Sequence, residues 1–389
     1  MYKIKTINKI AAVGINHFDP SRYEVGNDVE NPDAILVRSA NMLDMDLPVN
    51  LKAIARAGAG VNNIPIDQCS KKGIVVFNTP GANANAVKEL AIASAILTSR
   101  DIIGGVNWVK KQPLDIDIAK EVENGKKAFA GPELFGKKLG VFGLGAIGAM
   151  VANTAVELGM EVYGYDPYIT VEGAWRLYHS IRRAADPKII YETCDYIALH
   201  MPVTAETKGF INAKVLDSMK DGVRIINLSR GDLVNNPDMA AALESGKVAC
   251  YLTDFPSAEI MQMKNVIAVP HLGASTPESE DNCAVMAVNE LIDYLENGNI
   301  KNSVNFPDVI NPKGGDESLC VIHENKPNML AQISSALSAE GLNIENLSSR
   351  SKKDLGYSVF EIIGKCPAAV VEKLKAVDGI IRVTIINNR

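Results

Sequence analysis

The stretch from Leu139 to Gly148, which reads Leu-Gly-Val-Phe-Gly-Leu-Gly-Ala-Ile-Gly, constrains the fold of this chain more than any other segment. A short apolar run leads into Gly143, Gly145 and Gly148, and the residues that follow have helical composition. Gly143 would permit a tight turn, Gly145 would let a diphosphate approach the backbone, and Gly148 would let the helix pack close to the strand. The order of strand, glycine turn and helix therefore predicts a dinucleotide-binding fingerprint.

The residues after the fingerprint strengthen this prediction. The phosphates would face the start of the helix at Ala146 and Ile147, where backbone N–H groups are free. A second apolar run, Glu161–Tyr165, ends at Asp166, about twenty residues past the glycines, where a carboxylate accepts hydrogen bonds from an adenosine ribose. No arginine follows Asp166 directly, and its charge would repel a 2′-phosphate, so we expect NAD rather than NADP.

Length and composition limit the class of protein. A chain of 389 residues with 47% hydrophobic residues predicts a globular protein of two to three domains. The formal charge of −6 and the lack of a long basic run argue against nucleic acid as a partner. The first residues do not resemble a signal peptide and no apolar run approaches the length of a membrane span, so we expect a cytoplasmic protein without membrane contact. The six cysteines lack Cys-x-x-Cys spacing, and we expect reduced core residues and no metal site.

The fingerprint lies deep inside the chain, so another folded region must precede it. Apolar runs at Ala34–Val37, Leu51–Ala55 and Ile74–Phe77 each end in a polar or glycine-rich turn, which is typical of a parallel α/β unit. Further strands are expected after the fingerprint, at Tyr196–Leu199, Ile225–Leu228, Val248–Leu252 and Val266–Val269. Thr276–Leu295 is predicted to form one long helix with Pro277 in its first turn.

The last seventy or so residues have a different pattern. Asn297-Gly298-Asn299 and Asn311-Pro312-Lys313-Gly314-Gly315 indicate a linker that ends near residue 317. Beyond it, the expected elements follow the order β-α-β-β-α-β of a small ferredoxin-like module. They are Leu319–His323, Met329–Glu340, Leu347–Ser351, Tyr357–Gly364, Ala368–Ala376 and Ile380–Ile386.

Several motifs, taken in order, resemble one known family. They are Arg56-Ala57-Gly58-Ala59-Gly60, Asn78-Thr79-Pro80, the fingerprint, His200-Met201-Pro202, Asn227-Leu228-Ser229-Arg230-Gly231 and Pro270-His271-Leu272-Gly273-Ala274-Ser275-Thr276. In this order the chain resembles the D-isomer-specific 2-hydroxyacid dehydrogenases over essentially its whole length, and more closely their phosphoglycerate dehydrogenase branch with a C-terminal ACT domain.

The resemblance implies an α/β fold in which a Rossmann-type nucleotide domain is inserted in a flavodoxin-like substrate domain, followed by a ferredoxin-like ACT module. The expected boundaries are 1–85 and 276–316 for the substrate domain with its return helix and linker, 86–275 for the NAD-binding domain and 317–389 for the ACT domain. In this family the active site lies in the cleft between the first two domains.

By the same resemblance, the catalytic residues are Arg230, Glu259 and His271. His271 would take the hydroxyl proton while hydride leaves the same carbon, since an imidazole titrates near neutrality. Glu259 would hold one ring nitrogen, and the forked guanidinium of Arg230 would grip the substrate carboxylate. Glu259 is aligned only by its distance from Asp254, because the segment lacks the family's usual Asp-Val-Phe beginning and the proline after the glutamate.

Further cofactor contacts are implied where later strands end. Asp254 resembles the acid near the nicotinamide end of the cofactor, although it could instead cap a turn. The remaining residues implied to contact NAD are Met201, Pro202, Leu228, Ser229, Arg230, His271, Gly273 and Ala274.

A phosphorylated substrate is suggested by the N-terminal region. Arg38, Ser39 and Arg56 resemble the positions that hold carboxylate and phosphate in phosphoglycerate dehydrogenases, and two guanidinium groups suit a dianion. Gly60 resembles a further substrate contact, and Asn83 resembles a further substrate or hinge contact. The alternative is that Arg38 and Arg56 are solvated or interface arginines.

The C-terminal module resembles ACT domains that sense amino acids. In relatives, paired modules bind L-serine through side chains at the positions of His323, Asn325 and Asn343. Asn328 stands where glycine is usual in the turn before the helix, and asparagine tolerates the backbone angles of such a turn. The alternative is a module that only joins subunits.

Together these features predict the NAD-dependent oxidation of D-3-phosphoglycerate to 3-phosphohydroxypyruvate, the first step of phosphorylated serine biosynthesis, by a homodimer or homotetramer that L-serine inhibits. One alternative is a dehydrogenase for another D-2-hydroxy acid, such as glycerate, lactate or 4-phosphoerythronate. Another is an NAD-sensing scaffold without turnover, against which the presence of Arg230, Glu259 and His271 and of the appended ACT module argues.

Overall fold

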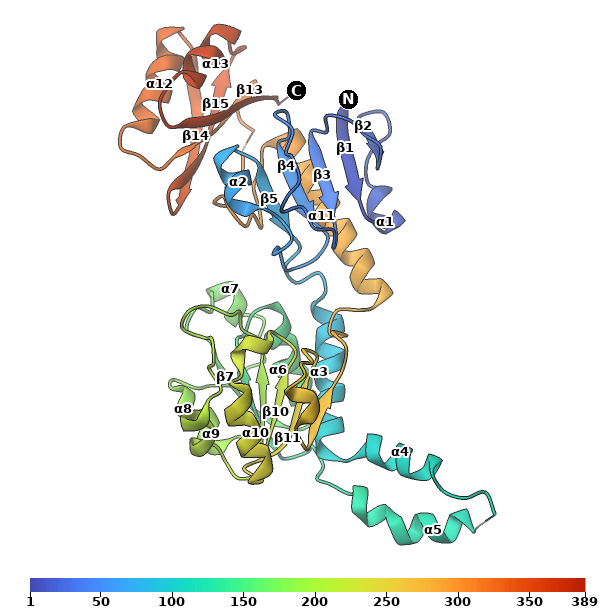
Figure 1. Ribbon diagram of the computed structural model, residues 1–389. Coiled ribbons are helices and arrows are strands. Elements are labelled where there is room, and N and C mark those ends of the chain that lie inside the picture. Colours follow the sequence, from blue (N-terminus) through green and yellow to red (C-terminus); the bar gives the residue numbers. More distant parts are fainter. Residues whose placement is uncertain (116, 312, 389) are drawn as a thin grey trace. The chain divides into compact units, whose positions relative to one another are not determined.

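The computed structural model describes residues 1–115, 117–311 and 313–388. Pro312, in the predicted linker, lies outside the described residues. Contacts divide the chain into two compact units (Figure 1). Ala84–Thr276 forms one, which we call the inserted unit, and Met1–Asn83 together with Pro277–Arg389 forms the other, which we call the two-segment unit.

The inserted unit contains a seven-stranded sheet in which every strand pairing is parallel. Its strand order, β12-β11-β10-β9-β6-β7-β8, is that of a doubly wound nucleotide-binding sheet and confirms the predicted fold class. The strands are β6 (Lys138–Phe142), β7 (Glu161–Tyr165), β8 (Arg182–Arg183), β9 (Tyr196–Leu199), β10 (Val223–Asn227), β11 (Val248–Thr253) and β12 (Val266–Ala268).

Helices cover both faces of this sheet, which explains why its central strand β9 is an unbroken run of buried apolar residues. One core gathers around Phe142 and Tyr251, and the other around Val141 and Tyr196. The helices are α3 (Ala84–Ser99), α4 (Ile102–Lys110), α5 (Ile118–Gly125), α6 (Ala146–Glu157), α7 (Val171–Ala174), α8 (Pro187–Thr193), α9 (Ala213–Ser218) and α10 (Asn236–Glu244), with short 3₁₀ turns η1 (Lys126–Phe129), η2 (Gly231–Leu233) and η3 (Ile260–Gln262). Helices α4 and α5 extend away from the sheet (Figure 1).

The two-segment unit begins with a five-stranded parallel sheet in the flavodoxin-like order β2-β1-β3-β4-β5. Its elements are β1 (Tyr2–Ile7), α1 (Ala12–Ile15), β2 (Tyr23–Gly26), β3 (Ala34–Val37), β4 (Ala53–Arg56), α2 (Ile66–Lys71) and β5 (Val75–Asn78). The long helix α11 (Pro277–Asn297) returns to pack against β3, β4 and β5. It begins one residue after the predicted start and ends two residues beyond the predicted end.

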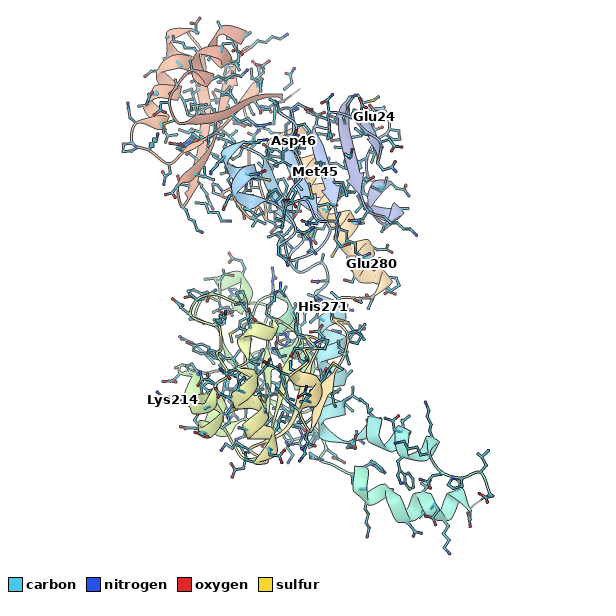
Figure 2. The ribbon with its side chains drawn as sticks, viewed as in Figure 1. Glu24, Met45, Asp46, Lys214, His271 and Glu280 are labelled. Carbon is cyan, nitrogen blue, oxygen red and sulfur yellow. The ribbon has the colours of Figure 1, made fainter. Side chains whose placement is uncertain are left out.

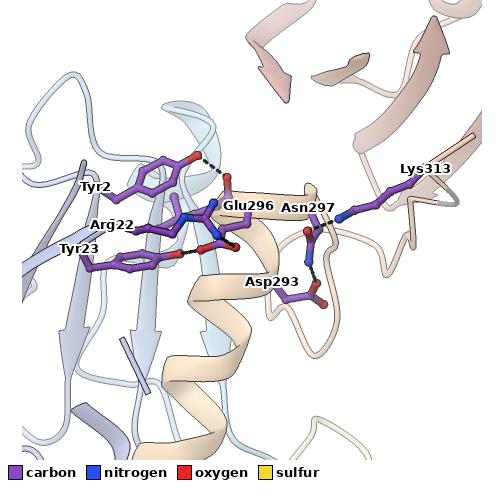
Figure 3. Close-up of polar contacts among 8 residues, drawn as sticks. Tyr2, Arg22, Tyr23, Asp293, Glu296, Asn297 and Lys313 are labelled. Carbon is purple, nitrogen blue, oxygen red and sulfur yellow. Dashed lines mark hydrogen bonds and ion pairs between the residues drawn. The ribbon is translucent and has the colours of Figure 1, made fainter. Parts of the chain in front are cut away.

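Polar contacts fix the end of α11 against the sheet (Figure 3). Tyr23 donates its hydroxyl to Glu296 Oε1 at 2.5 Å, and Arg22 pairs with Glu296 Oε2 at 2.7 Å. The hydroxyl of Tyr2 donates to the carbonyl of Leu295 at 2.7 Å. These contacts fix α11 in place. This helix completes the two-segment unit, which begins almost 280 residues earlier in the chain.

The C-terminal residues form the predicted β-α-β-β-α-β module. Its antiparallel sheet has the order β14-β15-β13-β16, which is the ferredoxin-like arrangement. The elements are β13 (Glu317–Glu324), α12 (Met329–Ala339), β14 (Asn343–Lys352), β15 (Leu355–Ile363), α13 (Ala368–Lys375) and β16 (Ile380–Asn387). Asn328 adopts a left-handed conformation with φ of 71°, as expected for the residue that replaces glycine there.

The module packs directly on the rest of its unit. Cys320, Ile322 and Tyr357 belong to the same buried cluster as Leu36 and Phe77 of the parallel sheet. The hydroxyl of Tyr357 also donates to the carbonyl of Gly298 at 2.6 Å. The contact pattern therefore groups residues 317–389 with the parallel sheet in one unit.

Two global features complete the fold. Over the part of the chain that the structure describes, no helix combines the length and the apolar character needed to cross a bilayer. All six cysteines are unbridged, and four are buried; Cys250 and Cys366 are half-buried rather than core residues.

Candidate functional site

The residues predicted to bind the cofactor follow strands of the inserted unit. Because all its strands are parallel, their carboxyl ends lie at one edge of the sheet, where doubly wound folds bind ligands. The glycine turn follows β6, and Asp166 follows β7. Met201 and Pro202 come after β9, Leu228, Ser229 and Arg230 after β10, Asp254 after β11, and His271, Gly273 and Ala274 after β12.

Two glycines of the fingerprint are required by the backbone. Gly143 has a φ of 86°, and a Cβ there would lie 2.5 Å from the carbonyl oxygen of His200. A Cβ at Gly148 would lie 1.9 Å from the carbonyl oxygen of Gly143, so helix α6 can approach the strand only without a side chain at this position. Both roles agree with those predicted from the sequence.

Gly145 differs, because it faces open space. Apart from its two chain neighbours, no described residue has an atom within 4 Å of where its Cβ would be, and no described side chain caps the helix that it precedes. The first N–H groups of α6, at Ala146 and Ile147, therefore have no capping side chain among the described residues. A diphosphate fits this arrangement, since it supplies the negative charge and acceptors that a helix N-terminus lacks.

Asp166 contacts the same turn. Its Oδ2 accepts the backbone N–H of Leu144 at 2.8 Å, and its Oδ1 accepts that of Tyr168 at 2.9 Å. A carboxylate has about four acceptor positions, so both oxygens keep capacity for ribose hydroxyls. The acid thus fixes the turn as well as standing where a ribose acceptor is expected.

His200 has a place in the site that sequence reasoning did not assign. It directly follows β9 beside the glycine turn, with its Cβ 3.3 Å from the position of a Gly148 Cβ. Neither ring nitrogen has a hydrogen-bond partner within the described chain, and burial lowers the pKa of the imidazole to about 4. His200 is therefore a neutral ring beside the cofactor turn, and its position in the quoted His-Met-Pro motif was the available signal.

Arg230 is positioned through its main chain. The buried Asn227 donates its side-chain amide to the carbonyl of Arg230 at 2.9 Å, and the hydroxyl of Ser229 donates to the carbonyl of Leu199 at 2.7 Å. The guanidinium donates to the carbonyl of Ser229 at 2.6 Å and is otherwise exposed. The loop is thus fixed while the charged group stays available for a carboxylate.

Asp254 holds the loop that carries His271. Its Oδ2 accepts the backbone N–H of Gly273 at 3.0 Å, and its carbonyl accepts the N–H of His271 at 3.0 Å. His271 has a φ of 36°, and its ring lies 5.1 Å from the ring of Phe255. These contacts fix the backbone of the predicted base.

Asp254 also has an unused oxygen. The residue is 1% exposed, and burial raises the pKa of its carboxyl despite the opposing charges of His271 and Arg230. Its Oδ1 is buried without a hydrogen-bond partner among the described residues. An acceptor in this state suits an amide donor of a bound ligand, and the role near the nicotinamide stays a prediction.

Glu259 occupies a different environment from the one predicted. Its Oε2 accepts the side-chain amide of Asn236, at the start of α10, at 3.0 Å. It lines a groove with Pro237 and Ala240, and no hydrogen bond between Glu259 and His271 is present in the described part of the chain. The structure therefore brings Arg230 and His271 close to Asp254, whereas the predicted glutamate contacts Asn236 at the start of α10.

The predicted anion-binding residues lie in the two-segment unit, after β3 and β4. Arg56 donates its Nε to the carbonyl of Arg38 at 2.9 Å, and the guanidinium of Arg38 forms an ion pair with Glu280 of α11. Figure 2 labels Glu280 on this helix and His271 in its loop. The backbone N–H of Ser39 donates to Asn8 Oδ1 at 3.2 Å.

The two arginines act on a common neighbour. Both lower the pKa of the Cys283 thiol, although burial is the larger effect and raises it. Two positive charges therefore lie near the first turns of α11. Gly60 follows β4, and Asn83 ends the first segment of the unit.

The predicted effector residues of the C-terminal module are partly engaged. His323 is 4% exposed; its Nε2 contacts the hydroxyl of Ser358 at 2.9 Å and its Nδ1 the carbonyl of Glu324 at 2.7 Å. Asn325 donates to the carbonyl of Lys353 at 3.0 Å, and Asn343 starts the exposed edge strand β14. Within the chain, His323 is a structural residue of the module's core.

Comparison with known proteins agrees with this geometry. Residues 92–273 match the family model described as D-isomer specific 2-hydroxyacid dehydrogenase, NAD binding domain. The D-3-phosphoglycerate dehydrogenase of Escherichia coli (strain K12) is 32% identical over 351 residues, which cover 86% of this chain and 82% of that protein. The protein of the same name from Bacillus subtilis (strain 168) is 35% identical over 284 residues, covering 71% of this chain and 52% of that protein.

A solved structure is also similar. The NAD⁺-bound 3-phosphoglycerate dehydrogenase of Entamoeba histolytica superposes with a TM-score of 0.60 at 28% identity, covering 78% of this chain and 98% of that one. The chain spans about half the length of several curated relatives that it matches.

Proposed function

The chain belongs to the D-isomer specific 2-hydroxyacid dehydrogenase family, and on that premise we propose that it oxidises D-3-phosphoglycerate to 3-phosphohydroxypyruvate with NAD. The observation that carries the choice of substrate is the pair of guanidinium groups of Arg38 and Arg56 at the ends of neighbouring strands, where the Nε of Arg56 donates to the carbonyl of Arg38. Relatives named D-3-phosphoglycerate dehydrogenase support the same choice.

The cofactor role falls on the fingerprint turn and Asp166. The glycines and the uncapped start of α6 would hold the diphosphate, Asp166 the adenosine ribose, and the free oxygen of Asp254 the carboxamide. When bound, NAD supplies the hydride acceptor. Because burial lowers the pKa of His200 to about 4, its imidazole is neutral and adds no charge beside the glycine turn.

The chemical step needs a base for the hydroxyl proton and a cation for the carboxylate. His271 would take the proton from the hydroxyl at C2 as hydride leaves that carbon, giving the ketone, NADH and a protonated imidazole. Arg230 would bind the C1 carboxylate and polarise the C2 oxygen. Glu259 can orient the imidazole of His271 only if it breaks its hydrogen bond with Asn236. We therefore propose that its side chain moves during turnover.

The remaining substrate contacts would recognise the phosphate end. Arg38, Ser39 and Arg56 present two charges and a hydroxyl, while Gly60 and Asn83 provide backbone and amide contacts. A dianionic phosphate satisfies forked guanidinium donors better than a neutral hydroxyl does.

The direct test is NADH formation from a panel of D-2-hydroxy acids. We expect the highest kcat/KM with D-3-phosphoglycerate and much lower values with D-glycerate, D-lactate and 4-phosphoerythronate. A higher kcat/KM with one of the others would assign that substrate instead. NAD binding without turnover on any of them would support a sensing scaffold.

We further propose that L-serine inhibits the enzyme at a seam between paired C-terminal modules of a homodimer or homotetramer. Asn325 and the exposed Asn343 support this proposal, whereas His323 would have to release Ser358 to contact a ligand. Titration of L-serine up to millimolar concentrations during turnover tests it. An unchanged rate would leave the module as a structural element that joins subunits.

A further inference from the structure

Glu280 holds the guanidinium that the proposed phosphate site needs. It lies in the first turn of α11, and its Oε1 forms an ion pair with Nη2 of Arg38, which follows β3. The two side chains are 43% and 41% exposed, so a ligand from solvent can reach both. The candidate anion site therefore already contains an anion of the chain itself.

The surroundings show that this carboxylate belongs to the site and not to a separate surface pair. Arg56 donates to the carbonyl of Arg38. Both arginines also act to lower the pKa of the Cys283 thiol, which lies one turn beyond Glu280. The positive charge that would recognise a phosphate thus faces the first turns of α11. In the first turn of α11, Glu280 is the acid that the guanidinium of Arg38 contacts.

We propose that Glu280 is an intramolecular competitor that sets the affinity of this site for phosphate-bearing ligands. The inference rests on the proposed function, because it assigns Arg38 to the substrate phosphate. When such a ligand binds, Arg38 exchanges the carboxylate of Glu280 for phosphate oxygens. No covalent bond changes in this exchange.

The exchange is favourable because the two anions differ. A phosphate dianion carries more charge than a carboxylate and offers three acceptor oxygens to the fork of the guanidinium. The displaced Glu280 still lies at the N-terminus of α11, where a negative charge is stabilised. A ligand whose far end is neutral provides no anion for Arg38, so the ion pair between Arg38 and Glu280 stays in place.

Kinetics with Glu280→Gln test the proposal. Because exposed ion pairs are weak, removing the competitor should lower the KM for D-3-phosphoglycerate by about two- to fivefold. The KM for D-glycerate should stay the same, since its hydroxyl does not displace Glu280. A higher KM for D-3-phosphoglycerate, or a KM that falls equally for both substrates, would overturn the proposal.

Glu278→Gln is the matched control. Glu278 lies in the same first turn and interacts with the same helix N-terminus, but it has no ion pair with Arg38 in the described residues. It should therefore leave the KM for D-3-phosphoglycerate at the wild-type value. If Glu278→Gln lowered this KM as much as Glu280→Gln does, general charge and not competition would be responsible.

A second arm does not depend on turnover. Inorganic phosphate, titrated against the full chain by calorimetry, should bind about two- to fivefold more tightly to Glu280→Gln than to the wild type. In an Arg38→Ala background, Glu280→Gln should no longer change phosphate affinity. An equal phosphate affinity in wild type and Glu280→Gln refutes the inference, whereas absence of D-3-phosphoglycerate oxidation by the wild type refutes the proposed substrate alone.

Discussion

The backbone N–H of Gly273 donates to Asp254 Oδ2 at 3.0 Å, and this bond ties the loop that carries His271 to the end of β11. The carbonyl of Asp254 accepts the N–H of His271 as well, so one residue fixes the backbone on both sides of Leu272. The predicted base is therefore held by an acid whose Oδ1 is buried without a hydrogen-bond partner among the described residues.

Asp254→Ala should impair catalysis through this loop. Loss of the acceptor leaves the buried N–H of Gly273 unpaired, at a cost of about 1–3 kcal/mol, and frees His271 to move. We expect kcat to fall on the order of 10- to 100-fold, since small displacements of catalytic groups are costly. Steady-state kinetics measure this loss, and Asp254→Asn, which keeps an acceptor oxygen, should lose less; equal losses would argue against the positioning role.

His271→Ala should abolish turnover while NAD still binds. Removal of a general base lowers kcat by about 10²- to 10⁴-fold, whereas the fingerprint turn that would hold the diphosphate is untouched. Turnover assays and NAD calorimetry report the two effects separately. His179→Ala, an exposed histidine of the same unit, is the control and should behave as wild type; normal turnover by His271→Ala would exclude it as the base.

Arg38→Ala should weaken recognition of the phosphate selectively. Because a hydrogen bond to a charged group contributes about 1.5–3 kcal/mol, the KM for D-3-phosphoglycerate should rise about 10- to 100-fold, with little change for D-glycerate. The matched control is Arg22→Ala, which also removes an arginine that pairs with a glutamate of α11 but lies away from Arg56. Equal increases for both substrates would contradict the phosphate role.

The raised pKa of Glu290 predicts that the free energy of unfolding depends on pH. Burial raises the pKa of its carboxyl to about 8, although the amide of Asn302, which donates to Oε1 at 2.8 Å, opposes this shift. The folded state therefore binds a proton that the unfolded state releases above its ordinary pKa near 4.3. Stability from this group is present below about pH 4, falls as the pH rises, and is lost above about pH 8.

Thermal unfolding at pH 5 and pH 8.5 measures this effect. Glu290→Gln removes the titration, so the drop between the two pH values should be smaller than in the wild type by roughly 1–3 kcal/mol. Asp293→Asn, an acid one turn further along α11, is the control. A drop of the same size in Glu290→Gln and wild type would show that the carboxyl ionises normally in the folded protein.

Much of the fold follows from local patterns in the sequence. The buried parallel strand Tyr196–Leu199 is a continuous apolar run, and Gly143 and Gly148 are forced by close backbone approach, so the amino-acid sequence alone indicates both. The same patterns do not predict strand β1, because its Lys3 and Lys5 interrupt the apolar pattern in a strand whose partners lie on both sides. The two-residue β8 is too short to produce a pattern.

The side-chain partners of the candidate site could not be predicted in the same way. Arg38 and Glu280 are 242 positions apart, and their pairing depends on where α11 returns to the sheet. The contact of Glu259 with Asn236 depends on how a loop after β11 meets the start of α10. Motif order identifies such residues as candidates, whereas tertiary packing decides which of them meet.

The core that the C-terminal module shares with the parallel sheet has a consequence for protein engineering. Cys320, Ile322 and Tyr357 cover apolar side chains of the parallel sheet and α11, so a truncated chain ending before β13 would expose both surfaces to water. The module therefore cannot be exchanged between homologues simply by joining two sequences at its boundary. A working chimera would have to transplant the facing residues of the sheet and of α11 together with it.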